Sequence, residues 1–232
     1  MRLDKFLSVT KTASRSEATK AARQGRITVN GQAVRDCSVH IDENTDAVCF
    51  DGTPVIYKQF IYIMMNKPSG ILSASTDKKA KTVIDLLPYP YNSMGLFPCG
   101  RLDKDTVGLI ILTNDGELSH KLLSPKHHAE KLYRFILARP YDKSKNIEKG
   151  IMMDGKMTKP AVINMDDDTH GTIVLTEGKY HQIKRMFEYA GSEVIHLERL
   201  SFGGVELDSR LERGAWRPLT EKEEEILKTN AI

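Results

Sequence analysis

Apolar residues near the start of the chain recur at helical spacing. Leu3, Phe6 and Leu7 stand three and four residues apart, which predicts a short helix with one apolar face. A second helix is predicted to begin at Ser14, because Glu17 three residues later completes a capping box. The inner face of this second helix consists of alanines, Ala18, Ala21 and Ala22.

After residue 25 the chain alternates between apolar and polar positions, as half-buried strands do. Ile27 and Val29 precede Asn30-Gly31, a pair typical of a two-residue hairpin turn. Further short strands are expected around Val39, Ile41, Val48 and Phe50. Two helices and a small sheet therefore predict a compact module over residues 1–58.

Residues 59–232 carry longer apolar runs separated by helical patterns. Strands are predicted in the segments FIYIMMNKP, LIILT, KLYRFIL, TIVLT and EVIHLERL. Helices are predicted in ELSHKLLS, HQIKRMFEYAG and LTEKEEEILK, and a short one at residues 84–87 before Pro88. Many strands with interspersed helices indicate a mixed α/β or α+β domain.

Composition places the chain among ordinary globular proteins, with 40% hydrophobic and 28% charged residues. No apolar run reaches the roughly 18 residues that a membrane span needs, and the charged N-terminus lacks the core of a signal peptide. The cysteines at positions 37, 49 and 99 form no CxxC pair, so neither a disulfide framework nor a zinc knuckle is indicated. A cytoplasmic protein with reduced thiols is expected.

Positive charge is concentrated at the beginning of the chain. Residues 1–35 hold eight lysines and arginines against two acids, whereas residues 36–51 hold five acids and no lysine or arginine. The net charge of the whole chain is only +3. A phosphate backbone is a natural partner for such a local field, and a solvated basic face without function is the alternative. Charge alone leaves both open.

The segment GRLDKDTVGL, residues 100–109, is the clearest candidate for chemistry. Cations beside Asp103 would keep this acid ionised, which suits a nucleophile or a general base. DKDTV also resembles the DxDxT signature of phosphoryl-transferring hydrolases, although that motif requires a hydrophobic strand leading directly into the first aspartate. An aspartate that caps a turn and pairs with Arg101 is the third interpretation.

Several motifs, in order along the chain, resemble those of the RNA pseudouridine synthases. MNKPSG is similar to NKPxG, GRLDKDTVGL to GRLDxxTxGL, EGKYHQIKRMF to EGxxHQ(V/I)(K/R)RM, and LERLSFGGVEL to LxRxxFGxxxL. KLY at 131–133 stands where the family carries its active-site tyrosine. RLDKFL together with SRSEATKAARQGRITVNG resembles an S4 RNA-binding domain. The lysine in YHQIKRM favours the branch that acts on small-subunit rRNA.

The resemblance implies an α+β chain. A small S4-like α/β RNA-binding module at 1–58 would precede a pseudouridine synthase domain at 59–232 with a mixed, mainly antiparallel sheet. The implied activity is isomerisation of a uridine to pseudouridine in small-subunit (16S) ribosomal RNA, with large-subunit rRNA as the alternative target. The partner would be rRNA, bare or in an assembling subunit, and the protein is expected to be a monomer.

Neither a cofactor nor a metal is implied. The N1–C1′ bond breaks and C5 bonds to C1′, so no electrons are exchanged and no group is donated. His127 and His128 are adjacent and have no further ligand at metal-binding spacing, so no metal site is expected there.

The resemblance also assigns roles to single residues. Asp103 is implied as the catalytic carboxylate, acting on a uridine that has left its helix. Tyr133 would stack on the target base and Lys184 would pair with Asp103. Read without the motifs, Tyr133 would be a packed strand residue and Lys184 a solvent-facing helix lysine. His181 is expected to be structural. The expected RNA contacts are Arg2, Lys5, Arg15, Arg23, Arg26, Asn30, Lys67 and Arg101.

A non-catalytic rRNA-binding assembly factor is the alternative from a different functional class. Such a protein would keep the basic S4-like module and lose the acid. The presence of Asp103, Tyr133 and Lys184 together favours the enzyme.

Overall fold

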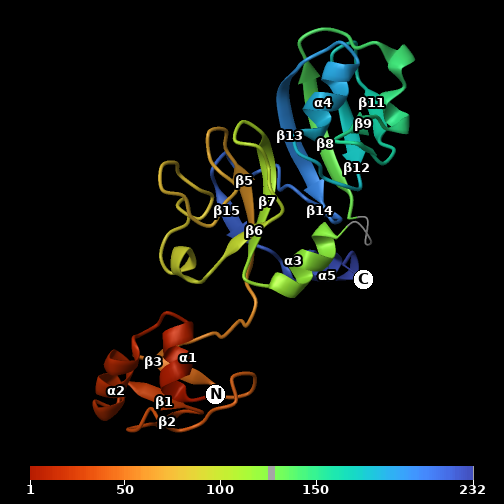
Figure 1. Ribbon diagram of the computed structural model, residues 1–232. Coiled ribbons are helices and arrows are strands. Elements are labelled where there is room, and N and C mark those ends of the chain that lie inside the picture. The colour runs from red at the N-terminus through yellow and green to blue at the C-terminus, as the bar shows by residue number, and fades with distance from the viewer. Residues whose placement is uncertain (125–128, 232) are drawn as a thin grey trace. The chain divides into compact units, whose positions relative to one another are not determined.

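The structure, a computed structural model, describes residues 1–124 and 129–231, so His127 and His128 lie outside the described residues. Contacts within the chain divide it into two units, Met1–Phe60 and Ile61–Ile232 (Figure 1). No helix in the described part of the chain has both the length and the apolar content needed to cross a bilayer.

The first unit packs two helices on a small antiparallel sheet. The helices are α1 (Leu3–Val9) and α2 (Arg15–Arg23), and the strands, β1 (Ile27–Val29), β2 (Gln32–Ala33), β3 (Val48–Phe50) and β4 (Thr53–Pro54), lie in the order β2-β1-β3-β4. Ser14 and Glu17 form the predicted capping box. Leucine, phenylalanine and alanine side chains from both helices are buried against Ile27 and Val48.

The strands predicted around Val39 and Ile41 are wrong. The carbonyl group of Val39 accepts a hydrogen bond from the N–H of Leu3, and the N–H of Ile41 donates to the carbonyl group of Met1. Because the start of α1 satisfies these backbone groups, no ladder forms with a neighbouring strand. Among the described residues, the backbone pairing of this segment consists of one isolated antiparallel bridge between Arg2 and His40.

The second unit is built on a nine-stranded sheet (Figure 1). The strands are β5 (Tyr62–Lys67), β6 (Phe97–Cys99), β7 (Val107–Thr113), β8 (Lys131–Leu137), β11 (Val162–Met165), β12 (His170–Leu175), β13 (Val194–Phe202), β14 (Val205–Glu206) and β15 (Trp216–Pro218). Their order is β11-β12-β8-β13-β7-β5-β15, with β14 paired to β13 and β6 to β7. Among the described pairs only β13 and β7 run parallel, so the predicted mixed, mainly antiparallel sheet is confirmed.

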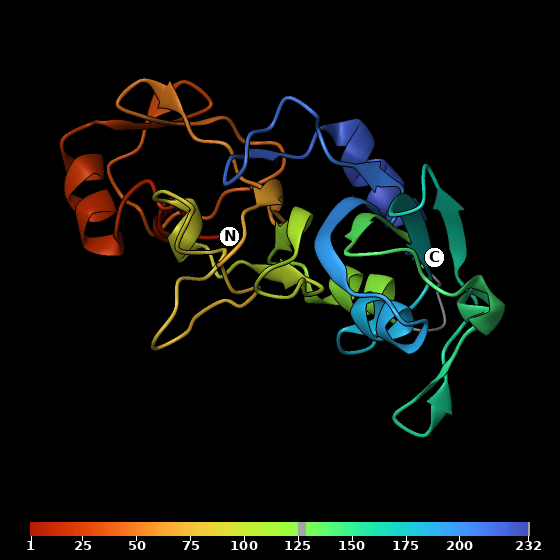
Figure 2. The same ribbon diagram turned by 90° about the horizontal axis from the view of Figure 1, so that it is seen from above.

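Helices and a separate ribbon complete this unit. The helices are α3 (Gly116–Leu123), α4 (Gln182–Tyr189) and α5 (Glu221–Thr229), with short 3-10 turns at Tyr91–Ser93, Lys143–Lys145 and Ile147–Lys149, and β9 (Met152–Met153) pairs with β10 (Lys156–Met157). Helix α4 lies alongside β13 (Figure 2). Its apolar side packs Phe187 against Phe135 of β8, with the ring centres 4.6 Å apart. This packing fixes α4 against the sheet, which matters for the site described below.

The short helix predicted at residues 84–87 is wrong. The segment is a turn, in which the N–H of Thr82 donates to the carboxylate of Asp85 and the N–H of Leu87 donates to the carbonyl group of Ile84. Ile84 and Leu87 are buried in the core nevertheless. A turn therefore satisfies the apolar pattern, and Pro88 leaves no room for a longer helix.

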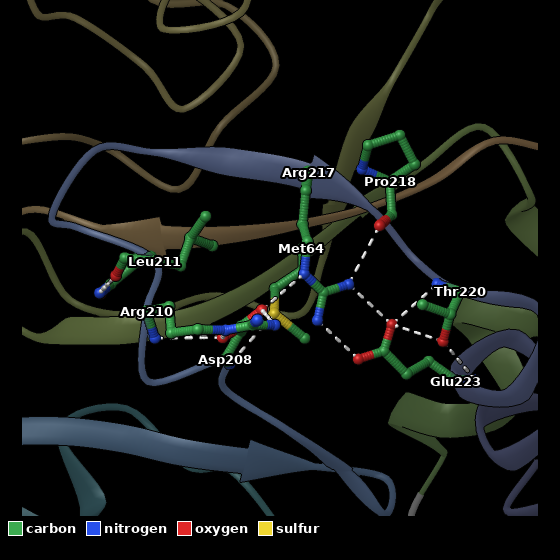
Figure 3. A network of polar contacts seen from close by, with 9 residues as sticks. Met64, Asp208, Arg210, Leu211, Arg217, Pro218, Thr220 and Glu223 are labelled. Atoms are coloured by element: carbon green, nitrogen blue, oxygen red, sulfur yellow. Dashed lines mark hydrogen bonds and ion pairs between the residues drawn. The ribbon is translucent and has the colours of Figure 1, made fainter.

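The last helix is attached to the sheet through a network around Arg217 of β15 (Figure 3). Its guanidinium donates two hydrogen bonds of 2.8 Å to Glu223 of α5 and one of 3.1 Å to Asp208. Thr220 and Glu223 also form the capping box that the sequence predicts. The hydrogen bonds from Arg217 lower the pKa of Glu223 to about 2. The edge strand β15 is thereby held to both the sheet and α5.

Candidate active site

A cavity of about 840 Å³ lies in the second unit, between segments that are distant in sequence. Residues 100–106, which connect β6 to β7, form one wall. Residues 177–184, which lead into α4, form another, and Lys131 and Tyr133 of β8 also line the cavity. Asp103, Tyr133, Lys184 and Arg101 all line this cavity. The fold therefore brings the three expected catalytic residues to one place.

The loop that carries Asp103 is held from beneath by Lys67, the last residue of β5. The Lys67 Nζ donates hydrogen bonds to the carbonyl oxygens of Pro68, Asp103, Lys104 and Thr106, at 3.2, 3.1, 3.1 and 2.9 Å. Its side chain is 0% exposed, and burial lowers its pKa to about 8. The ammonium of Lys67 is thus committed to backbone carbonyl groups, and contact between Lys67 and RNA stays a prediction.

The Asp103 carboxylate faces two basic side chains from the start of α4. Lys184 Nζ lies 3.3 Å from Asp103 Oδ2, and His181 Nε2 lies 3.6 Å from Asp103 Oδ1. The Asp103 side chain is 27% exposed, so it is accessible from the cavity while its partners hold it.

His181 reaches the acid because of an unusual backbone conformation. Its φ of 50° places it in the left-handed region directly before α4, and its ring stacks on Tyr180 with the centroids 3.8 Å apart. The sequence predicted only a structural role for His181. Its position in the same short motif as Lys184 was the signal that could have placed it beside Asp103.

Lys184 is shared between two carboxylates. Its Nζ lies 2.7 and 2.8 Å from the two oxygens of Asp105, closer than it lies to Asp103. Burial lowers the pKa of Lys184, but the hydrogen bond to Asp105 and the charge of Asp103 outweigh this effect and the pKa is raised. The bond from Lys184 in turn lowers the pKa of Asp105. Asp105 was not singled out from the sequence, although the DKDTV motif contains it.

Tyr133 enters the cavity from β8 and is largely buried in the apolar core. Its neighbours in the sheet are Ile173 of β12 and Arg199 of β13. Arg199 in turn lies opposite Gly108 of β7. A Cβ on Gly108 would lie 2.3 Å from the Arg199 carbonyl oxygen, so only glycine permits β7 and β13 to approach this closely.

The phosphohydrolase interpretation of DKDTV finds no support in this geometry. Strand β6 ends at Cys99, so no strand runs directly into Asp103. The ammonium group of Lys184 lies between Asp103 and Asp105, where a bridging cation would have to bind. Among the described residues no group of three or more histidine, cysteine, aspartate or glutamate side chains could hold a metal ion.

The expected RNA contacts of the first unit differ in how much free charge they offer. Arg2 pairs with Asp4 at 2.8 Å, Arg26 pairs with Asp51, and the Asn30 side chain donates to Asp46 at 2.8 Å. Lys5, Arg15 and Arg23 are exposed and form no ion pair with any residue that the structure describes. RNA contact by all of these side chains stays a prediction, as does that by Arg101.

Comparison with known proteins agrees with the site. The family model described as RNA pseudouridylate synthase matches residues 61–189, and the S4 domain model matches residues 1–46. A solved structure titled as that of a pseudouridylate synthase is 40% identical, with a TM-score of 0.68, and the match covers 98% of this chain and 99% of that one.

Curated relatives match over nearly their whole length. An uncharacterized RNA pseudouridine synthase of Bacillus subtilis is 43% identical over 98% of both chains. Ribosomal small subunit pseudouridine synthase A of Haemophilus influenzae is 41% identical, over 98% of this chain and 99% of that protein. The protein of the same name from Escherichia coli K12 is 39% identical, over 96% and 98%. This chain therefore belongs to the RNA pseudouridylate synthase family, whose members are isomerases, and it carries an N-terminal S4 domain.

Proposed function

We propose that this protein converts a uridine of small-subunit (16S) ribosomal RNA to pseudouridine, with Asp103 as the catalytic carboxylate. Two lines of support are the full-length similarity to relatives named for the small ribosomal subunit and the S4 domain. The observation that carries the proposal is the half-buried carboxylate of Asp103, held 3.3 Å from Lys184 in a cavity that Tyr133 also lines.

The isomerisation needs a uridine that has left its helix, at a cost of a few kcal/mol. Tyr133 offers an aromatic ring on which the base can stack, and the exposed Arg101 stands at the rim to occupy the vacated space or bind the backbone. Asp103 then acts at the sugar C1′, at C6 of the base, or as a base toward a sugar proton. In each case Lys184 Nζ, 3.3 Å from Oδ2, supplies a positive charge beside the acting carboxylate.

The S4 domain supplies affinity for the RNA in this proposal. Lys5, Arg15 and Arg23 are exposed cations without an ion pair among the described residues, and such side chains neutralise phosphate groups. The capture of rRNA would then depend on the first unit, and the chemistry on the second.

Incubation of the purified protein with 16S rRNA tests the activity. Pseudouridine is mapped by carbodiimide modification and primer extension. Asp103→Asn is expected to bind the RNA and form no pseudouridine. Asp105→Asn is the matched control, since the same chemical change two residues away leaves the reacting carboxylate in place and isomerisation measurable. Pseudouridine formation by Asp103→Asn would remove this residue from its role.

Mapping of rRNA from cells with and without the protein identifies the target. Loss of one pseudouridine from 16S rRNA in cells that lack the protein is the expected result. Loss from large-subunit rRNA would support the alternative target. An unchanged pattern in both rRNAs, with a defect in subunit assembly, would support the non-catalytic assembly factor instead.

A further inference from the structure

Two buried cations line the cavity and have no role in the site described above. Arg199 of β13 is 1% exposed, and Lys131, the first residue of β8, is 8% exposed. The Arg199 Nε donates to the carbonyl oxygen of Leu109 at 2.7 Å, and the Lys131 Nζ donates to that of Ala129 at 2.7 Å. Both charges lie over the ring of Phe202, at 5.1 and 5.5 Å from its centre.

No carboxylate among the described residues forms an ion pair with either cation. The Nη2 of Arg199 has no hydrogen-bond partner there at all, and neither has the hydroxyl oxygen of Thr106, which lines the same cavity. Burial together with the charge of Arg199 lowers the pKa of Lys131 to about 8. Buried charges and donors without partners are costly, and natural proteins retain them where a ligand completes their bonding.

The depth of these cations indicates which part of a nucleotide would meet them. The Asp103 side chain is half-buried, whereas Lys131 and Arg199 are almost completely enclosed. The exposed cations of the cavity, Arg101 and Lys104, belong to its rim. A uridine that enters base-first leaves its phosphates near the rim and takes its uracil ring past Asp103 toward the enclosed pair.

The chemistry of the isomerisation creates negative charge on that ring. When the N1–C1′ bond breaks, its electron pair stays on N1 and is shared with the O2 and O4 oxygens. If Asp103 instead adds to C6, the electron pair of the C5–C6 double bond ends on O4 as an enolate. Every route open to Asp103 that detaches or activates the base therefore places negative charge on a carbonyl oxygen of uracil. A buried donor aimed at developing charge is an effective form of catalytic stabilisation.

We propose that Arg199 and Lys131 form an oxyanion site that binds a carbonyl oxygen of the target uracil and stabilises its negative charge during isomerisation. The proposal rests on the proposed function, because it requires a uridine in this cavity. The phosphate group of the same nucleotide is the other source of an anionic oxygen, and the experiment distinguishes the two.

Single-turnover conversion at saturating RNA provides the test, with RNA fragments that carry one changed atom at the target nucleotide. The fragments contain uridine, 2-thiouridine, 4-thiouridine, or a phosphorothioate on either side of the target. Conversion of the unmodified fragment by the wild-type protein is measured first and tests the proposed function alone. Its failure would show that the enzyme or its target is misassigned, independently of the oxyanion site.

The variants Lys131→Met and Arg199→Lys are then compared with the wild-type protein. The first keeps the volume of the side chain and the second keeps its charge while it loses the planar fork. Both are expected to lower the single-turnover rate on unmodified RNA by a factor of about 10 to 100. Thermal unfolding confirms that each variant is folded, and Lys104→Met removes the same charge from the rim as a control.

The thio substitutions locate the contact. Sulfur is a weaker hydrogen-bond acceptor, so one of the two thiouridines should slow the wild-type protein, and this effect should shrink at least about fivefold in both variants. Lys104→Met should weaken RNA binding and leave the thio effect unchanged. Unaltered rates in both variants would overturn the proposal. The proposal would also be overturned if a phosphorothioate effect disappeared in the variants while the effects of the thiouridines stayed unchanged. Arg199 and Lys131 would then bind the phosphate group instead of the uracil.

Discussion

The buried ammonium group of Lys67 donates a hydrogen bond of 3.1 Å to the backbone carbonyl group of Asp103. The acid is therefore positioned through its main chain from below, while its carboxylate remains free to face the cavity. Three further carbonyl groups of the same region accept bonds from this one cation. The conformation of the acid-bearing loop thus depends on a side chain that is completely buried.

Lys67→Met should destabilise the protein and lower its turnover together. The substitution leaves four carbonyl groups without their shared donor, and the free energy of unfolding should fall by about 3 kcal/mol. Urea unfolding and single-turnover kinetics measure the two effects. Lys104→Met, which changes an exposed side chain of the same loop, should alter stability by less than about 0.5 kcal/mol. Equal effects from the two substitutions would show that Lys67 does not hold the loop.

Lys131→Met should have the opposite effect on stability. Among the described residues Lys131 donates one hydrogen bond, to Ala129, and its pKa is lowered to about 8 from 10.5 for an ordinary lysine. The titratable groups around it are Arg199, Lys159, Glu177 and the thiol of Cys99, whose own pKa is raised by burial. Between pH 8 and about 10.5 the unfolded chain binds more protons than the folded one, so stability rises with pH across this window. Below pH 8 the protonated buried ammonium lowers the free energy of unfolding.

At pH 7 the substitution should therefore raise the free energy of unfolding, by on the order of 1–2 kcal/mol after the lost hydrogen bond is subtracted. At pH 10.5 the gain should be largely absent, because the wild-type lysine is then neutral in the folded state. Urea unfolding at both pH values measures it. A gain of the same size at both would contradict the explanation from buried charge.

Lys184 and Asp105 should differ in their effect on turnover. Lys184→Met removes the positive charge beside Asp103. The single-turnover rate should therefore fall by about a hundredfold. Asp105→Asn removes only the second carboxylate that holds Lys184, and the loss should stay below about tenfold. The two rates are measured on the same RNA fragment at saturation. Equal losses would mean that Lys184 acts mainly through Asp105.

Exposed and ion-paired arginines of the S4 domain should contribute differently to RNA binding. Arg15→Gln and Arg23→Gln should each weaken binding and reduce the slope of log K against log salt by roughly one. Arg26→Gln should change the slope less, because Arg26 already pairs with Asp51. Filter binding over a series of salt concentrations gives the slopes. Identical slopes for all three variants would show that the ion pair does not limit RNA contact.

Local signals in the sequence predicted much of the secondary structure. The capping boxes at Ser14 and Thr220 and the Asn30-Gly31 turn depend on a few neighbouring residues. The local sequence therefore contains all the groups that form these features. Residues 84–87 and the segment around Val39 failed for the converse reason. Ile84 and Leu87 are buried by tertiary contacts, and the backbone groups of Val39 and Ile41 bond to the start of α1, neither of which a short pattern can distinguish from a helix or a strand.

The site was predictable where a motif names a residue and unpredictable where burial decides its role. Asp103, Tyr133 and Lys184 lie in recognisable motifs, and the fold brings them to one cavity. Lys67 also lies in a motif, but nothing in the letters NKP shows that its ammonium is enclosed. The proximity of Arg199 to Lys131 arises from the pairing of β13 with β8, which joins residues that are far apart in the chain.

The parallel contact between β7 and β13 joins two half-sheets through only two residue pairs, Glu198 with Val107 and Arg199 with Gly108. The acid-bearing loop leads into β7, whereas Tyr133 and helix α4 belong to the other half. The spacing between Asp103 and the proposed partners Tyr133 and Lys184 is consequently set by main-chain contact between β7 and β13. Insertions and substitutions in the surface loops can therefore change which RNA is bound without altering the distance between Asp103 and the residues on the β13 side of the sheet.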